Sequence, residues 1–124
     1  MPRRKSPLIL MSAAATAALA ATALGAATRQ TKTISADKTK LAFTTQSIVA
    51  KPGTFTLKMA NPSTTKHNIA VRGGQLGFAK VGKSVLKGGT SEVTFTARAG
   101  KTYTFFCQIP GHETAGMRGK IVVK

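Results

Sequence analysis

The chain has 124 residues, 19 of them Lys or Arg and three Asp or Glu, which gives a formal net charge of +16. This length suits one domain and excludes a two-domain enzyme with a cleft between lobes. The single Cys excludes an intramolecular disulfide and zinc modules built on two or four cysteines, while 42% hydrophobic and 18% charged residues favour a folded core.

The first 27 residues have the pattern of a secretory signal peptide. Arg3, Arg4 and Lys5 form a positively charged start, and residues 8–27 are apolar or small. An uncleaved N-terminal anchor is the alternative, because about 20 apolar residues can span a bilayer. The stretch is rich in Ala, which inserts weakly and favours cleavage. We therefore expect an exported protein of the periplasm or cell surface, by the Sec or the Tat route.

The rest of the chain has the pattern of an all-β domain. Residues 28–32 are predicted to be a flexible lead-in, and residues 33–124 a domain without a useful helix-period stretch. Apolar and polar residues alternate in several short runs with turn signals between them, which predicts a β-sandwich or barrel. Residues 73–89 contain six glycines and are predicted to form a long loop with at most one short strand or helical turn. The alternating runs are 54–59, 67–72, 93–98, 103–107 and 121–123.

The positive charge calls for an anionic partner. Without the three basic residues of the leader, the net charge of residues 28–124 is still +13. Nucleic acid is the usual partner of such a chain. However, an exported protein rarely meets it, and no Arg-rich helix or interleaved aromatic residues point to it. An acidic protein, an anionic membrane or an acidic cell-wall polymer is favoured.

The residues that could carry chemistry are one Cys, two His and one Met. Cys107, His112 and Met117 are spaced five residues apart between two predicted strands, and His67 lies about forty residues upstream. A thiolate, two imidazoles and a weak thioether are the donors of a trigonal copper site with a long axial bond. Apolar side chains should keep water from such a metal. Candidates for that wall are Phe43, Phe55, Phe95, Phe105 and Ile109.

Each of these residues alone has a commoner structural explanation. A lone Cys at a strand end is most often a small buried hydrophobe, and a lone Met usually fills a gap in a core. A single His is likewise more often structural. The combination at this spacing, with Pro110-Gly111 inside it, is what indicates copper.

Two segments resemble cupredoxins, the type 1 blue copper proteins. Residues 102–123 closely resemble the C-terminal copper loop of that family. Asn61-Pro62 and residues 66–69 resemble the segment that supplies its first His ligand. The resemblance covers roughly residues 33–124 and is closest to the plastocyanin and auracyanin-like branch.

This resemblance implies a Greek-key β-sandwich with one type 1 copper ion that transfers electrons. By the match, His67, Cys107 and His112 are the strong ligands and Met117 is the axial ligand. Asn68 occupies the place where the family uses an Asn to tie the two ligand loops together by hydrogen bonds.

The sequence also departs from plastocyanins. Four residues separate Cys107 from His112, where plastocyanins usually have two and auracyanin-like members have four. The acidic patch of plant plastocyanins is missing, and Phe106 replaces the Tyr that many plastocyanins carry before the Cys. These differences concern the photosynthetic partner more than the copper site.

The function expected is that of an exported electron carrier that is not an enzyme. Four protein ligands would leave no open position for substrate, and no separate acid–base pair is present. Copper storage or delivery with the same ligands is the alternative. A metal-free wall-binding module is a third possibility, which the intact set of four ligands argues against.

Partners are expected to dock at the edge of His112, the ligand nearest solvent in the family. An apolar rim would surround it, formed by Ile109, Pro110, Ala115 and Gly116. Lys66 and Arg118 flank ligand residues and would make the outer rim basic. We expect a monomer that meets acidic redox proteins transiently.

Overall fold

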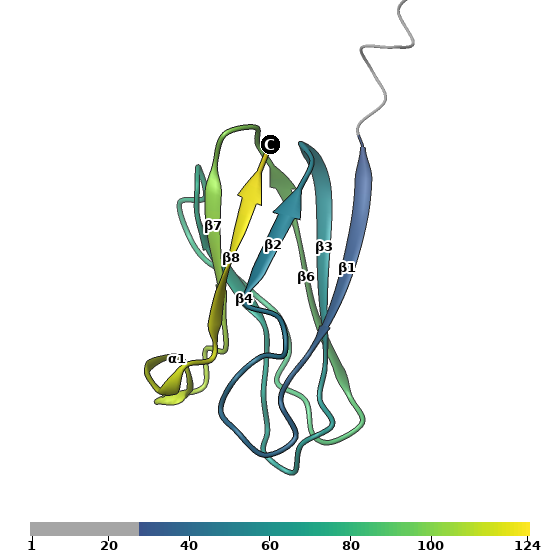
Figure 1. Ribbon diagram of the computed structural model, residues 1–124, viewed down its shortest axis with the longest axis vertical. Coiled ribbons are helices and arrows are strands. Elements are labelled where there is room, and N and C mark those ends of the chain that lie inside the picture. Colours follow the sequence, from purple (N-terminus) through teal and green to yellow (C-terminus); the bar gives the residue numbers. More distant parts are fainter. Residues whose placement is uncertain (1–27) are drawn as a thin grey trace, which may run out of the picture.

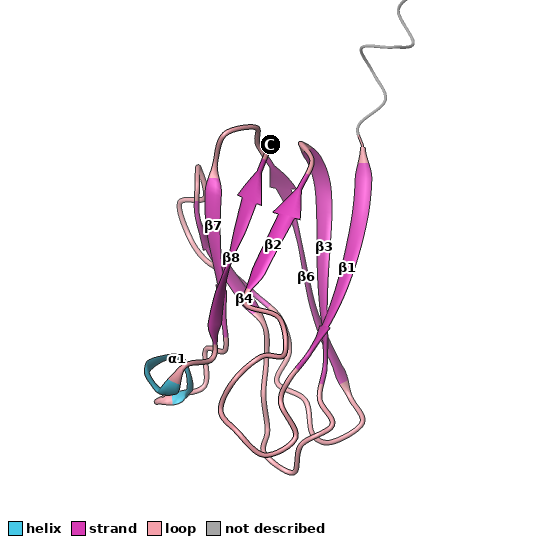
Figure 2. Cartoon of the chain, viewed as in Figure 1, coloured by secondary structure: helices cyan, strands magenta, loops and turns pink. Residues whose placement is uncertain are grey.

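Two β-sheets packed face to face make up residues 28–124, the part of the chain that this computed structural model describes (Figure 1). The strands are β1 (Arg29–Ser35), β2 (Ser47–Ala50), β3 (Gly53–Ala60), β4 (Ala70–Gly73), β5 (Lys80–Val81), β6 (Thr90–Ala97), β7 (Thr102–Phe106) and β8 (Arg118–Val123). One sheet has the order β1-β3-β6 and the other β2-β8-β7-β4-β5. A single turn of helix, α1 (His112–Ala115), lies at one end of the sandwich (Figure 2).

The predicted alternation is confirmed in the strands that face the core. In β6 every second side chain is buried, and β3 follows the same pattern across the antiparallel pair. Phe55 and Phe95 are register partners whose ring centroids lie 5.6 Å apart. Each buried apolar side chain of this size contributes about 1.5–3 kcal/mol, so this inner face fixes which side of each strand points inward.

One edge strand of each sheet is held by a parallel pair that joins distant parts of the chain. β1 pairs with β3, and β2 pairs with β8. β8 follows all other strands in the chain, yet it lies inside its sheet, between β2 and β7. The family-type β-sandwich expected from the sequence is therefore confirmed.

The predicted lead-in at residues 28–32 is wrong over residues 29–32, which belong to β1. Arg29 is the register partner of Thr54, and the Gln30 side chain exchanges hydrogen bonds of 2.7 and 2.9 Å with the backbone of Lys51. Most side chains of β1 are exposed, so it shows no apolar alternation. The expected signal peptide, residues 1–27, lies outside the described residues. Within residues 28–124, no helix is long and apolar enough to cross a membrane.

The region around residues 67–89 is partly as expected. The Gly-rich stretch is a long loop that contains one short strand, β5, as predicted. The alternation predicted across residues 67–72 is wrong, because all residues from His67 to Val71 are buried and β4 begins only at Ala70. Asn68 points into the protein because its side chain accepts a hydrogen bond from the backbone of Gln108.

Gly119 in β8 leaves no room for a side chain, which gives a first test of this packing. An added Cβ would overlap the ring of Phe105 and lie 2.6 Å from the carbonyl oxygen of Gln46. We expect Gly119→Ala to lower the free energy of unfolding by about 1–3 kcal/mol, as overpacking does. Chemical denaturation of the metal-free protein measures this. Gly77→Ala, where nothing lies within 4 Å of the added Cβ, is the matched control and should not lower stability. Equal stabilities would contradict the packing described.

Candidate metal centre

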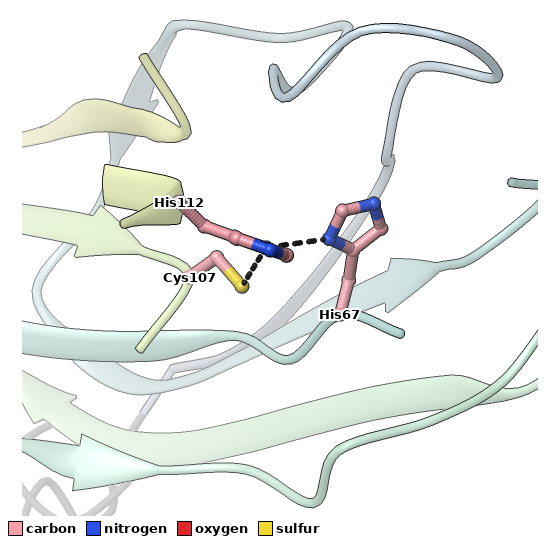
Figure 3. Close-up of side chains that lie close together, drawn as sticks. All are labelled: His67, Cys107 and His112. Atoms are coloured by element: carbon pink, nitrogen blue, oxygen red, sulfur yellow. Dashed lines mark hydrogen bonds between the residues drawn. The ribbon is translucent and has the colours of Figure 1, made fainter. Parts of the chain in front are cut away.

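Three side chains from two distant segments meet at the end of the sandwich that carries α1 (Figure 3). His67 lies in the loop between β3 and β4, Cys107 directly follows β7, and His112 is the first residue of α1. The strands bring these segments together because β4 and β7 are antiparallel neighbours, with Ala70 paired to Phe106.

The donor atoms of the three side chains point at one another. The two Nδ1 atoms of His67 and His112 are 3.2 Å apart, and His112 Nδ1 lies 3.5 Å from Cys107 Sγ. All donor atoms lie within 4.8 Å of one another. Bonds from His nitrogen and Cys sulfur to a zinc ion, for comparison, are about 2.0 and 2.3 Å long, so these separations suit donors that share one metal ion. Two imidazoles and one thiolate are also a donor set that copper accepts.

Two of the three donor residues are shielded from solvent. Cys107 and His67 are 0% and 1% exposed, whereas His112 is only partly buried. His112 is therefore the donor nearest to solvent. Met117 is fully buried. Its backbone N–H donates to the carbonyl of His112, and its carbonyl accepts from the N–H of Cys107, both at 3.1 Å. Met117 thus closes the loop that begins at Cys107.

Burial keeps His67 in the form that binds metal. The pKa of His67 is lowered from its ordinary value, first because burial disfavours the charged ring and second because His112 would repel it. A neutral imidazole has a free lone pair for a metal ion. The backbone N–H of Asn68 also points at Cys107 Sγ from 3.5 Å.

The Asn68 side chain links the two ligand segments. Its Oδ1 accepts a 2.7 Å hydrogen bond from the backbone N–H of Gln108, the residue after Cys107. Its Nδ2 donates to the carbonyl of Gly82 at 3.3 Å. Asn68 is 3% exposed, and within the described residues no buried side-chain polar atom lacks a partner.

A second polar cluster fixes His67, and sequence reasoning missed it. The backbones of His67 and Val85 exchange hydrogen bonds of 3.2 and 2.8 Å. The buried side chain of Asn61 donates to the carbonyls of Val85 and Thr65. Its Oδ1 accepts from both the backbone and the hydroxyl of Ser63. Asn61-Pro62 signalled a turn, but the contact with Val85, 24 residues on, left no local signal.

The predicted apolar wall is only partly at the site. Phe105, two residues before Cys107, packs against Phe43 with ring centroids 5.5 Å apart. The prediction is wrong for Phe55 and Phe95. Phe95 packs on Tyr103 at 4.8 Å, at the opposite end of β7 from Cys107, and Phe55 packs on Phe95. Both belong to the core of the sandwich.

The expected rim and docking residues lie on the surface. Pro110, Ala115 and Gly116 are exposed next to His112 in the chain. Ile109 is partly buried and packs against the core. Lys66 and Arg118 are also exposed, one before His67 and the other at the start of β8.

Another contact that sequence reasoning missed is an ion pair between Arg72 and Glu113. The two side chains lie 41 residues apart in the chain, and their guanidinium and carboxylate form two hydrogen bonds. The pKa of Glu113 is lowered chiefly by the hydrogen bond from Arg72, with smaller contributions from the charges of Arg72 and Arg118.

Solved structures share this fold. Auracyanin B matches with a TM-score of 0.68 over 80% of this chain and 91% of its own, at 22% identity. Auracyanin A from Chloroflexus aurantiacus, a "blue" copper protein, matches with a TM-score of 0.65 at 27% identity, over 78% of this chain and 100% of its own.

Sequence comparisons agree with the site. Curated auracyanin-A of Chloroflexus aurantiacus is 32% identical, and the match covers 68% of each chain. Rusticyanin of Acidithiobacillus ferrooxidans is 54% identical over 48 residues, which are 39% of this chain and 30% of rusticyanin, so the chain matches less than a third of that relative. The pattern of the copper binding proteins of the plastocyanin/azurin family matches residues 30–124. The chain therefore belongs to the plastocyanin/azurin family of copper-binding proteins.

Proposed function

We propose that this protein is a type 1 copper electron carrier whose strong ligands are His67, Cys107 and His112 and whose axial ligand is Met117. The observation that carries the proposal is the convergence of two imidazole Nδ1 atoms and one thiol on one buried point. The bound copper would supply one-electron chemistry. The side chains would supply a mixed donor set that suits both of its oxidation states.

The surroundings of the donors support a carrier because they restrict movement. Asn68 links the two ligand segments, and the Met117 backbone closes the Cys107 loop by two hydrogen bonds. Donors held in this way change position little when the charge at the site changes, which favours fast electron transfer. His112, only partly buried, is the edge through which electrons would pass. With four protein ligands there is no place for a substrate, so we infer no enzymatic activity.

We also propose that the carrier works outside the cytoplasm, as a monomer, with acidic redox partners. The basis for export is the charged start and apolar stretch of residues 1–27. The basis for acidic partners is the charge of +13 on residues 28–124, because opposite charges speed encounter. An anionic membrane or cell-wall surface would attract the same positive charge and is the alternative partner.

The first test of the function is the colour and redox behaviour of the copper-loaded protein. We expect an intense blue colour from the bond between Cys107 and copper, and reversible reduction with the copper retained. Cys107→Ser should abolish the colour and the tight site. Visible spectroscopy and voltammetry measure both.

Two other results would contradict the carrier. A blue Cys107→Ser variant would show that Cys107 is not a ligand. Rapid loss of copper from the wild type to a mild acceptor, without stable redox cycling, would favour storage or delivery instead.

Copper affinity should depend on pH because protons compete for the same nitrogen atoms. The pKa of His67 lies below its ordinary value of 6.5, so His67 is unprotonated at neutral pH and carries no proton for copper to displace. Affinity should therefore change little through His67 above pH 6.5, and should fall in more acidic solution as the pH approaches the lowered pKa. Competition titrations with a chelator over this range measure it. NMR of the His67 ring in the metal-free protein tests this separately from the other donors, and a titration midpoint at or above 6.5 would contradict the prediction.

Electron transfer with an acidic partner should slow as salt increases. Charges on the rim of a docking surface act mainly on the encounter rate, and about 0.1 M salt screens them beyond roughly 10 Å. Lys66→Glu and Arg118→Glu should slow transfer at low salt and leave the blue colour unchanged. Stopped-flow mixing with an acidic redox protein measures the rate, with Lys101→Glu, exposed before β7, as the control. Unchanged rates in both rim variants would contradict docking through these residues and would favour a role of the positive charge in binding a membrane or cell wall.

A further inference from the structure

Arg72 contacts the residues on either side of the Cys107–His112 loop, which are Phe106 and Glu113. Its Nη1 and Nη2 donate to Glu113 Oε1 and Oε2 at 2.7 and 2.5 Å, so the pair is bidentate. Its Cζ lies 4.4 Å from the centroid of the Phe106 ring. Glu113 directly follows His112, and Phe106 directly precedes Cys107. Arg72 itself lies in β4, five residues after His67.

The helix α1 has little else to hold it. None of its residues is buried, so apolar burial does not fix its position. Among the described residues, His112 and Glu113 are the only side chains of α1 that hydrogen bond beyond the helix. Without Glu113, the only side-chain hydrogen bonds from α1 to the sandwich would be those of the donor His112 itself.

The contact has the features that make a partly exposed ion pair effective. Most surface ion pairs contribute little because solvent screens them and both side chains lose freedom. Here the pair is bidentate, which is the strong geometry for Arg and carboxylate. The guanidinium also lies against an aromatic ring that is 7% exposed. Lys cannot replace Arg in this contact, because an ammonium offers neither the planar face nor the two parallel donors.

We infer that Arg72 is a positioning residue for the metal centre. It holds α1, and with it His112, against β4, and so keeps the donor nearest to solvent in place. This inference rests on the proposed copper function for its effect on copper. The positioning of α1 can also be measured in the metal-free protein.

The experiment uses Arg72→Lys, Glu113→Gln and the double variant. Arg98→Lys and Glu92→Gln are matched controls, because both are exposed, lie on β6 or just after it, and make the same chemical change away from the site. Glu92 forms only a 3.9 Å ion pair with Lys58. The wild type must first be shown to be blue with copper, which tests the proposed function alone.

In the copper-loaded variants we expect copper loss to a chelator to become about tenfold faster, as when groups that orient metal ligands are changed. The charge-transfer bands and the copper hyperfine splitting should shift, because His112 is no longer held in one position. The double variant should match the single variants, since both remove one interaction. The controls should stay within about twofold of the wild type.

In the metal-free variants we expect faster amide exchange at the N–H groups of Ala115, Gly116 and Met117, which donate to carbonyls within the α1 loop. Amides in the centre of β6 should be unaffected. Blue variants with wild-type copper loss, spectrum and amide exchange would overturn the inference and leave the copper function intact. Equally faster exchange in α1 and β6 would also overturn it, since that is a general loss of stability. A colourless wild type would end the copper function, and the exchange data would still decide the role of Arg72.

Discussion

One hydrogen bond, from the backbone N–H of Gln108 to the side chain of Asn68, joins the two segments on which the metal centre depends. His67 comes from one segment, and Cys107 and His112 come from the other, so no local structure can set their separation. Because Asn68 is buried, its amide has to find partners within the protein. The same residue directs its own N–H at the sulfur of Cys107. Asn68 therefore contacts the Cys107 segment twice, through its side chain and through its backbone.

The loop that carries Cys107 and His112 is held from two sides by different kinds of contact. Asn68, itself 3% exposed, acts from the interior through a 2.7 Å hydrogen bond to the backbone of Gln108. Arg72 acts from the outer face of the five-stranded sheet, where its side chain is 44% exposed. The sandwich itself contributes a rigid end to which both contacts are anchored, because β4 and β7 are paired through four residues. The directional contacts of Asn68 and Arg72 then fix the position of the Cys107–His112 loop, which non-directional apolar packing would not do.

Much of the fold could be predicted because its signals are local. Phe55, Leu57 and Met59 alternate with polar residues, and the structure buries all three. The spacing of Cys107 and His112 within one loop also needs no long-range information. By contrast, β1 has mostly exposed side chains, and only its parallel pairing with β3 makes it a strand. Periodicity cannot detect such a strand.

The missed features of the site have the same cause. The helix α1 is a single turn, bounded by Gly111 and Gly116 with φ angles of 83° and 126°, too short to show a helical period. Arg72 and Glu113 are 41 residues apart, and each reads in the sequence as an ordinary exposed charge. Asn61 reads as a turn residue, although its side chain reaches Val85. Contacts of this kind can be recognised only once the fold is known, because the sequence alone does not show which distant residues meet.

The position of β8 has a consequence for the order in which the molecule assembles. Every other strand precedes β8 in the chain, but β8 separates β2 from β7 in the finished sheet. A nascent chain that still lacks β8 has β2 without its partner, and the turn after His112 has no strand to return to. Pairing over such sequence distances closes late and slowly, because loop-closure entropy must be overcome first. The segments of His67 and Cys107 can meet earlier through the pairing of β4 with β7. The loop that carries His112 is closed only when β8 is in place, because Met117, whose backbone bonds to Cys107 and His112, leads directly into that strand.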